Sequence, residues 1–320
     1  MNVVITGGAG FLGLRLARAL LAQGIRDARG GSTPVDRLVL ADRAAAPDLG
    51  DPRAEQRIGD IADTGFLAAL VADADIVYHL AAVVSGEAEA DFDLGMRVNI
   101  DASRALLEAC RATERAPRVI FTSSVAVFGP VADDSEPEVD PRSSYGMEKA
   151  VAELLLKDYA RRGFVDGMVL RLPTISVRPG RPNKAASSFA SGVVREPLSG
   201  KRGVCPVPLD TVLWLLSPRQ AISGLVHAAG LSAEQLAAGR IINLPGITVT
   251  VAEMLAALER QGGSAARALV DMEPDPMVAQ IVTNWPRRWN DGPARALGFS
   301  GDSDFDAIVR AYVEDDLPGA

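Results

Sequence analysis

The stretch Thr6-Gly7-Gly8-Ala9-Gly10-Phe11-Leu12-Gly13 decides the fold of this chain. It follows the apolar run Val3–Thr6, which has the pattern of a buried strand, and it opens a helical pattern. Gly7 permits a tight turn, Gly10 lets the backbone approach a pyrophosphate, and Gly13 allows close packing of helix on sheet. The free amides at the helix start would face the phosphates. We therefore predict a dinucleotide-binding turn, the alternative being a tight turn that binds no ligand.

Apolar strands alternate with helical patterns through the first half of the chain. The further predicted strands are Arg37–Asp42, a short one before Gly59, Asp75–Ala82, Arg118–Thr122 and Gly167–Leu172. The predicted helices are Phe11–Gln23, about 91–115 and about 144–161, and Ile25–Pro34 is a glycine-rich surface loop. This alternation is typical of a parallel sheet covered on both faces. The predicted fold class is therefore α/β, a Rossmann-type doubly wound parallel sheet.

The character of the chain changes after Pro173. Prolines and glycines become frequent, and apolar segments such as Val212–Leu216 stand alone. We predict a Rossmann domain over residues 1–175, with later returns to the sheet around residues 209–245. Residues 176–320 then form mainly a smaller, loop-rich C-terminal lobe that binds the substrate.

The composition argues against several functional classes. The chain has 320 residues, a formal net charge of −8 and no basic stripe, so nucleic acid is not an expected partner. No apolar run reaches the roughly 18 residues that a membrane span needs, and the N-terminal stretch lacks the shape of a signal peptide. Two cysteines and two histidines are too few for a disulfide framework or a metal cluster. We therefore expect a cytoplasmic protein with no metal and no membrane partner.

Tyr145 and Lys149 provide the main catalytic signal. They lie four positions apart, which places them on one face of a helix. A tyrosine phenol has a pKa of about 10 and is a poor base at neutral pH. A nearby lysine ammonium favours the phenolate and lowers that pKa. The pair can then take a proton from an alcohol or return one to a carbonyl, although the same spacing arises by chance on many helices.

Candidates for cofactor binding follow the ends of the predicted strands, where a parallel sheet faces its ligand crevice. Asp42 would bond the ribose hydroxyls of NAD and repel the phosphate of NADP, while the adjacent Arg43 could tolerate that phosphate. Asp60 could accept from the adenine amino group or could cap a helix. The neighbouring candidates for the same pocket are Ile61, Leu80, Ala81 and Ala82.

Ser124 is the candidate that would hold the substrate oxygen. It lies just past the strand Arg118–Thr122, with Ser123 and Thr122 as alternates. Its hydroxyl could orient this oxygen while Tyr145 moves the proton, or it could cap a turn. A Ser/His/Asp hydrolase is not expected, because no Gly-x-Ser-x-Gly elbow follows a strand. His79 lies within an apolar strand and is expected to be a packed core residue.

These residues together resemble the extended short-chain dehydrogenase/reductase superfamily, of the NAD-dependent epimerase/dehydratase type. The shared motifs, spread over residues 1–245, are Gly7, Gly10, Gly13, Asp42, Asn99, Ser124, Tyr145 and Lys149. The resemblance implies bound NAD and a catalytic set of Ser124, Tyr145 and Lys149, with Lys149 also bonding the nicotinamide ribose. It implies that Phe11, Leu12, Asn99, Pro173 and Ile175 complete the cofactor site. It also implies a homodimer, in which helices at about 91–115 and 144–161 form a four-helix bundle.

The second half of the chain resembles D-erythronate dehydrogenases, in the stretches Arg181–Phe189 and Arg195–Leu198. This resemblance implies oxidation of the 2-hydroxyl of a small sugar acid by NAD, most simply D-erythronate to 2-keto-D-erythronate. The candidate donors for the substrate carboxylate are Arg178, Asn183, Lys184, Ser187 and Ser188. Trp214 could close a small pocket around such a substrate.

Two other functions stay open at this point. A nucleotide-sugar 4-epimerase with tightly bound NAD would use the same catalytic residues, and a nucleotide diphosphate would also suit the donors near Arg178. A non-catalytic protein that senses NAD could use the same fold, but such proteins usually lack the Tyr/Lys pair.

Overall fold

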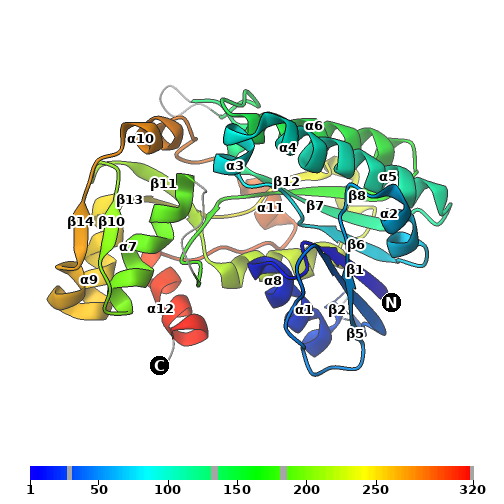
Figure 1. Ribbon diagram of the computed structural model, residues 1–320, viewed down its shortest axis with the longest axis horizontal. Coiled ribbons are helices and arrows are strands. Elements are labelled where there is room, and N and C mark those ends of the chain that lie inside the picture. The colour runs from blue at the N-terminus through cyan, green and yellow to red at the C-terminus, as the bar shows by residue number, and fades with distance from the viewer. Residues whose placement is uncertain (27–30, 131–135, 181–185, 318–320) are drawn as a thin grey trace.

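The computed structural model describes residues 1–26, 31–130, 136–180 and 186–317 (Figure 1). A seven-stranded sheet forms its centre, in the order β12-β8-β7-β6-β1-β4-β5. Its strands are β1 (Asn2–Thr6), β4 (Arg37–Asp42), β5 (Ala54–Ile58), β6 (Ile76–His79), β7 (Arg118–Ser124), β8 (Asp166–Leu172) and β12 (Ile241–Asn243). All neighbouring pairs are parallel. The predicted doubly wound α/β fold is therefore confirmed, and the strand order reverses between β1 and β6, where ligands of such sheets bind.

Helices cover both faces of this sheet, as Figure 1 shows. On one face α1 (Phe11–Gln23) and α8 (Pro218–Ala229) bury Leu16, Leu20 and Leu225 against β1 and β6. The other face is covered by α2 (Thr64–Val71), α5 (Ala102–Ala112) and α6 (Ser144–Arg161). Each helix contributes an apolar stripe, and burying these stripes stabilises the arrangement.

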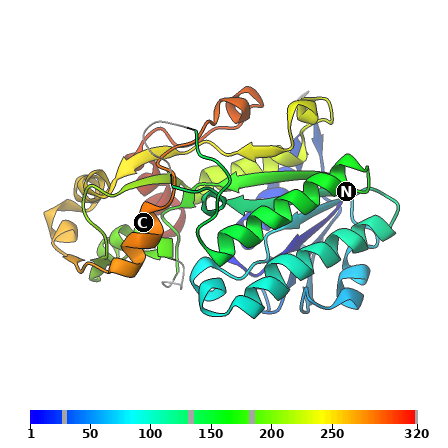
Figure 2. The same ribbon diagram turned by 90° about the horizontal axis from the view of Figure 1, so that it is seen from above.

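A smaller lobe lies at one end of the sheet and has its own apolar core (Figure 2). Its strands are β9 (Thr174–Ile175), β10 (Gly203–Cys205), β11 (Val212–Leu216), β13 (Ile247–Thr250) and β14 (Val270–Met272). Its helices are α7 (Phe189–Leu198), α9 (Val251–Arg267), α10 (Pro276–Thr283) and α12 (Phe305–Asp316). Helix α8 packs on the main sheet and β12 pairs with β8, while the returns to the sheet around residues 209–245 stay a prediction. The boundary at residue 175 stays a prediction.

The remaining elements are short. They are β2 (Ile25–Arg26), β3 (Ser32–Thr33), α3 (Ser85–Ala90), α4 (Phe92–Gly95) and α11 (Gly292–Ala296). One π-helical segment is η1 (Met96–Asp101). Short 3₁₀ helices are η2 (Val125–Val127), η3 (Ala186–Ser188) and η4 (Gln235–Ala238). Within the described residues, no helix combines the length and the apolarity that crossing a membrane requires.

Three predicted elements differ from the structure. The long helix at 91–115 is divided into α4, the π-helical turn η1 and α5. The π turn aims the buried Asn99 side chain at the backbone of Val83, a long-range contact that periodicity does not reveal. The loop Ile25–Pro34 contains a small antiparallel pair, β2 with β3, because Ile25 is buried under α8. The strand expected at Asp75–Ala82 ends at His79.

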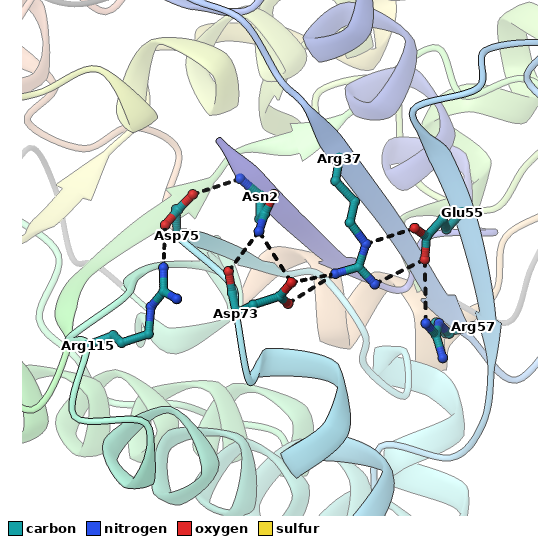
Figure 3. A network of polar contacts seen from close by, with 7 residues as sticks. All are labelled: Asn2, Arg37, Glu55, Arg57, Asp73, Asp75 and Arg115. Carbon is teal, nitrogen blue, oxygen red and sulfur yellow. Dashed lines mark hydrogen bonds and ion pairs between the residues drawn. The ribbon is translucent and has the colours of Figure 1, made fainter.

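A network of charged residues joins the strand starts, at the end of the sheet opposite the glycine turn (Figure 3). Arg37 on β4 lies between Glu55 and Asp73, with guanidinium nitrogens 2.8 and 2.9 Å from their carboxylates. Asp75 accepts a hydrogen bond from the backbone of Asn2 at 2.8 Å and pairs with Arg115. These contacts are partly exposed, so each contributes at most about 1 kcal/mol. Together they hold the loop before β6 against the first residue of β1.

Candidate active site

A cleft crosses the carboxyl ends of β1, β6 and β7, at the point where the strand order reverses. It consists of two cavities of about 340 and 310 Å³, which share Gly7, Gly10 and Leu80 in their walls. The first reaches toward the ends of β4 and β5, and the second toward α6 and the lobe. Two chambers joined at the glycine turn are the shape that the two halves of a dinucleotide require.

The glycine turn forms the common wall of the two chambers. Gly7 has φ +72°, and a Cβ there would lie 2.9 Å from the backbone nitrogen of Ala81. A Cβ on Gly13 would overlap the carbonyl oxygen of Gly7. Helix α1 begins without a side-chain cap, so its first amides are left for a ligand. The turn therefore presents bare backbone, which fits a bound pyrophosphate.

The first chamber gathers the residues expected around the adenosine half of the cofactor. Its wall includes the predicted Asp42, Asp60, Ile61, Leu80, Ala81 and Ala82. Asp42 also accepts hydrogen bonds from the backbone amides of Ala9 and Ala44, each at 3.1 Å. This carboxylate is thereby fixed beside the glycine turn, where it can face a ribose. Asp60 uses one oxygen on the amide of Ala62, at 2.9 Å, so it supports its own loop as well as lining the chamber.

Ser124 and Tyr145 line the second chamber, and Lys149 lies buried next to them. Ser143 caps α6 by accepting from the amide of Gly146 at 3.1 Å, and this fixes the first turn that carries Tyr145. Ser124 is the last residue of β7, and its hydroxyl accepts from the amide of Ala126 at 3.2 Å and lines the chamber together with Tyr145. Lys149 lies one turn further along α6, with its ammonium 5.6 Å from the centre of the Tyr145 ring. The structure thus brings the three predicted catalytic residues together.

Burial controls the protonation of this group. It raises the pKa of Tyr145 to about 12, and the charge of Arg178 is the strongest influence in the opposite direction. Burial also lowers the pKa of Lys149 to about 8. The Lys149 ammonium donates to the carbonyl of Thr122 at 3.0 Å. Arg178 is therefore a second cation that acts on the phenol, in addition to Lys149, which the sequence predicted for that role.

Arg178 extends from the lobe into the second chamber. Its guanidinium lies 3.4 Å from the hydroxyl of Ser187, which lines the same chamber. Burial lowers the pKa of Arg178, and the nearby charge of Arg195 acts in the same direction. Among the described residues, no carboxylate forms an ion pair with Arg178. A half-buried guanidinium of this kind suits an anionic ligand, and two further predicted donors, Asn183 and Lys184, lie outside the described residues.

Phe11, Leu12, Pro173 and Ile175 line the second chamber as expected. Asn99 does not line either chamber. It is buried beneath them, and its side-chain oxygen accepts from the amide of Val83 at 2.8 Å. Its place in the expected cofactor site is therefore indirect, through the loop that it holds.

Several residues of the second chamber were not expected from the sequence. They are Val84, Ser85, Val125, Ala126, Leu172, Thr174 and Trp285. Trp285 occupies the place that Trp214 was expected to take. Trp214 instead packs in a buried cluster, with its ring centre 5.6 Å from that of Trp289. Trp285 follows α10 and comes to the cleft from far along the chain, so no local signal marks it.

A third cavity of about 270 Å³ adjoins this chamber. The two share Ser85, Ala126 and Trp285, and the third cavity extends to Gln280 and Asn284 near the end of α10. The space available beyond Tyr145 therefore exceeds what the second chamber alone provides.

Comparison with known proteins agrees with this geometry. Residues 3–214 match the NAD dependent epimerase/dehydratase family. A D-erythronate dehydrogenase of Cupriavidus necator is 56% identical over 98% of both chains, and one of Haemophilus influenzae is 44% identical over 99% of this chain and all of its own. The crystal structure of a nucleoside-diphosphate-sugar epimerase from Agrobacterium tumefaciens has a TM-score of 0.91 and 40% identity, covering 100% of this chain and 95% of its own. The chain therefore belongs to the NAD dependent epimerase/dehydratase family.

Proposed function

We propose that this protein is an NAD-dependent dehydrogenase that oxidises the 2-hydroxyl of a small sugar acid, with D-erythronate converted to 2-keto-D-erythronate. The observation that carries the proposal is Arg178, a half-buried cation without a carboxylate partner among the described residues. It lines the chamber that also holds Tyr145 and Ser124. A substrate carboxylate bound there would bring an adjacent hydroxyl to the catalytic pair. The two relatives named as D-erythronate dehydrogenases support the same substrate.

The proposed reaction is a paired transfer of a proton and a hydride. Tyr145, as phenolate, takes the proton of the C2 hydroxyl, and Ser124, which lines the same chamber, orients that oxygen through its own hydroxyl. The electrons of the O–H bond form the C2 carbonyl, and the C2 hydrogen leaves with its electron pair. NAD supplies the hydride acceptor when bound. Lys149 and Arg178 offset the negative charge on the phenolate.

The residues that would hold NAD divide between the two chambers. The bare backbone at Gly7, Gly10 and Gly13 would meet the pyrophosphate. Asp42 would bond the adenosine ribose, while Asp60 and Ile61 would border the adenine. The nicotinamide half would lie in the second chamber, beside the other proposed contacts Phe11, Leu12, Leu80, Tyr145, Pro173 and Ile175.

NADH absorbance tests this proposal directly. The purified protein is mixed with NAD and D-erythronate, with L-threonate and a UDP-sugar in parallel reactions. NADH that forms with D-erythronate but not with L-threonate is the expected result, since the two acids share the configuration at C2 and the chamber should distinguish the configuration at C3. Absence of NADH in every reaction would reject the dehydrogenase.

A nucleotide-sugar 4-epimerase is the second candidate, because the third cavity provides room beyond the catalytic pair. The similar structure named as an epimerase adds support. In that reaction NAD would be reduced and reoxidised on the protein without release of NADH. An epimerised nucleotide sugar, detected by chromatography with mass spectrometry in the UDP-sugar reaction, would favour this function over the first.

We also propose that the protein is a cytoplasmic homodimer, paired through α5 and α6. Leu154 on α6 is 64% exposed, and Met147 and Val151 lie on the same side of that helix. Two copies of the helix pair would bury this apolar stripe in a four-helix bundle. Light scattering is expected to give a dimer at micromolar concentration for the wild type and a monomer for Leu154→Glu. A wild-type monomer would exclude this assembly.

A further inference from the structure

A chain of buried polar groups runs beneath the cofactor cleft. The hydroxyl of Thr6 accepts from the amide of Ala81 at 3.3 Å and lies 2.7 Å from Nδ1 of His79. Nε2 of His79 lies 2.9 Å from the hydroxyl of Ser103, which donates to the backbone carbonyl of Asn99 at 2.7 Å. Because the Ser103 hydroxyl proton is used in the bond to Asn99, the Ser103 oxygen can only accept from His79. Nε2 must therefore carry the imidazole proton, and Nδ1 must accept from Thr6. Burial lowers the pKa of His79 to about 3, which keeps this ring neutral.

The side chain of Asn99 continues this chain toward two other elements. Its oxygen accepts from the amide of Val83 at 2.8 Å, and its nitrogen donates to the carbonyl of the same residue at 3.1 Å. The nitrogen also donates to a carboxylate oxygen of Glu148 at 2.6 Å. Val83 lines the first chamber and Val84 lines the second. The loop between β6 and α3, which forms a wall of both chambers, therefore depends on Asn99 for its position.

Glu148 is the unusual member of this group. It precedes Lys149 on α6 and has no exposed surface. One carboxylate oxygen binds Asn99, and the other has no hydrogen-bond partner among the described residues. A Cβ on Gly95 would overlap this second oxygen, so the carboxylate packs directly against the turn before η1. A buried carboxylate with so few partners lowers stability. An apolar side chain of the same length would fill the same space, so packing alone does not account for a glutamate here.

We propose that Glu148 is a positioning residue. By orienting the Asn99 amide, it fixes the loop wall at Val83 and Val84 relative to the helix that carries Tyr145 and Lys149. The cofactor would then be held at a set distance from the catalytic pair. This inference rests on the proposed NAD site and is independent of which acid or sugar is the substrate.

Binding of NADH, followed by isothermal titration calorimetry, tests the proposal without any substrate. Glu148→Met keeps the length of the side chain and removes the acceptor, so the dissociation constant for NADH is expected to rise about tenfold. Glu148→Gln keeps an oxygen for the Asn99 amide and is expected to bind NADH within about twofold of the wild type. If the wild type itself fails to bind NADH, the proposed cofactor site fails and the positioning role fails with it.

A double-mutant cycle with Asn99→Ala separates this role from general damage. If Glu148 acts through Asn99, Glu148→Met is expected to add little to the loss of NADH affinity that Asn99→Ala causes. Independent losses that multiply in the double variant would overturn the proposal. Should the Asn99 variant not fold, the comparison of Glu148→Gln with Glu148→Met decides, and equal affinities for NADH would contradict it.

Glu153 provides the matched control. It lies further along α6, is equally buried and pairs with Arg171 at 2.6 Å, and none of its hydrogen bonds within the described part of the chain reaches the loop at Val83. Glu153→Gln is expected to lower the melting temperature and to leave NADH affinity unchanged. A purely structural Glu148 would behave in the same way, with a lower melting temperature and wild-type affinity for NADH. That result would refute the positioning role.

Discussion

Tyr145 gives the most direct test at the scale of single residues. Tyr145→Phe removes the group that would accept the substrate proton and leaves the ring that borders the chamber. We expect kcat to fall about a thousandfold and the dissociation constant for NADH to stay within about twofold. Stopped-flow and steady-state NADH formation would measure the first value, and calorimetry the second. Turnover close to that of the wild type would remove Tyr145 from the mechanism.

Arg178 should determine affinity for the acid. Arg178→Met removes the proposed carboxylate partner, so KM for D-erythronate is expected to rise between about tenfold and a hundredfold. The affinity for NADH should change little, because the proposed site assigns Arg178 to the substrate carboxylate and not to the cofactor. Arg295→Met is a suitable control, since this arginine pairs with Asp291 on the surface. An unchanged KM in Arg178→Met would place the substrate carboxylate elsewhere.

The pH dependence of the reaction follows from the burial of Tyr145. Its pKa of about 12 means that the phenol is almost fully protonated near neutrality. The phenolate fraction therefore grows as pH rises, and kcat/KM for oxidation is expected to increase between about pH 6 and 9. Reduction of the keto acid needs the phenol and should not show this rise. Because the charge of Arg178 lowers the phenol pKa, Arg178→Met should move the oxidation profile to higher pH.

At this scale the N-terminal motifs were predictable because each has a local cause. Gly7 and Gly13 occupy positions where a Cβ has no room, and Tyr145 and Lys149 share a helix face. Arg178 was predicted as a carboxylate ligand, but its influence on Tyr145 depends on how the lobe packs. No local sequence pattern around Arg178 or Tyr145 indicates that packing.

Helix α6 is the element on which the geometry of the catalytic pair depends. Its second residue after the cap, Tyr145, is followed by Gly146, where a Cβ would overlap the carbonyl oxygen of Ala126. Gly146→Ala is therefore expected to displace the first turn of α6 from Ser124. A displacement of about 1 Å would lower kcat by about a hundredfold, which NADH formation would measure.

Gly192 in α7 is the control for that substitution. The nearest atom to a Cβ there is a carboxylate oxygen of Glu196 at 3.9 Å, an ordinary contact. Gly192→Ala should therefore stabilise α7 by about 0.5–1 kcal/mol, through the higher helix propensity of alanine, and leave kcat unchanged. Equal effects of the two substitutions on kcat would show that the crowding at Gly146 is unimportant.

Helices α1 and α6 begin and end at the predicted residues. Gly10 and Gly24 flank α1, Ser143 caps the start of α6, and apolar spacing continues through both helices. The helix expected at 91–115 shows the limit of that reasoning. Its apolar spacing continues through η1, whereas the π turn is held by contacts of Asn99 with Val83 and Glu148. Those partners lie 16 and 49 positions away along the chain, beyond any helical period.

At the scale of the whole molecule, the C-terminal helix ties the lobe to the sheet domain. Arg15 on α1 pairs with Asp315 and Asp316, and Arg219 on α8 pairs with Glu314 and Asp315. These partly exposed contacts should respond to ionic strength. Replacing Asp315 and Asp316 with Asn is expected to cost about 1 kcal/mol of unfolding free energy at low salt and less at high salt, as measured by urea denaturation.

A substitution at Asp306 on the same helix is a control that distinguishes attachment of the lobe from stability of the helix. It pairs with Arg260 inside the lobe. Asp306→Asn should weaken α12 without speeding hydrogen exchange in α1, whereas the double replacement at the helix end should speed it. If both variants leave exchange in α1 unchanged, the ion pairs do not couple the two parts.

The doubly wound sheet was predictable from the order of strands and helices, since parallel strands need covering helices. The second chamber was only half predictable. Its walls from β7 and α6 come from recognisable motifs, while Trp285 and the third cavity depend on where the lobe lies. Contacts between segments more than a hundred positions apart are set by the packed core of the lobe and have no local pattern.

The position of Trp285 gives the protein an optical signal of its own. Indole emission overlaps the absorption of reduced nicotinamide, so an indole in the wall of the second chamber can pass its excitation to NADH bound there. Binding of NADH in the cleft should therefore decrease the tryptophan fluorescence of the protein and increase the fluorescence of the nucleotide. Trp285→Phe would reduce the energy transfer to NADH and leave only the contribution of the buried pair Trp214 and Trp289. Occupancy of the cleft could then be followed in time, turnover by turnover, without an added label.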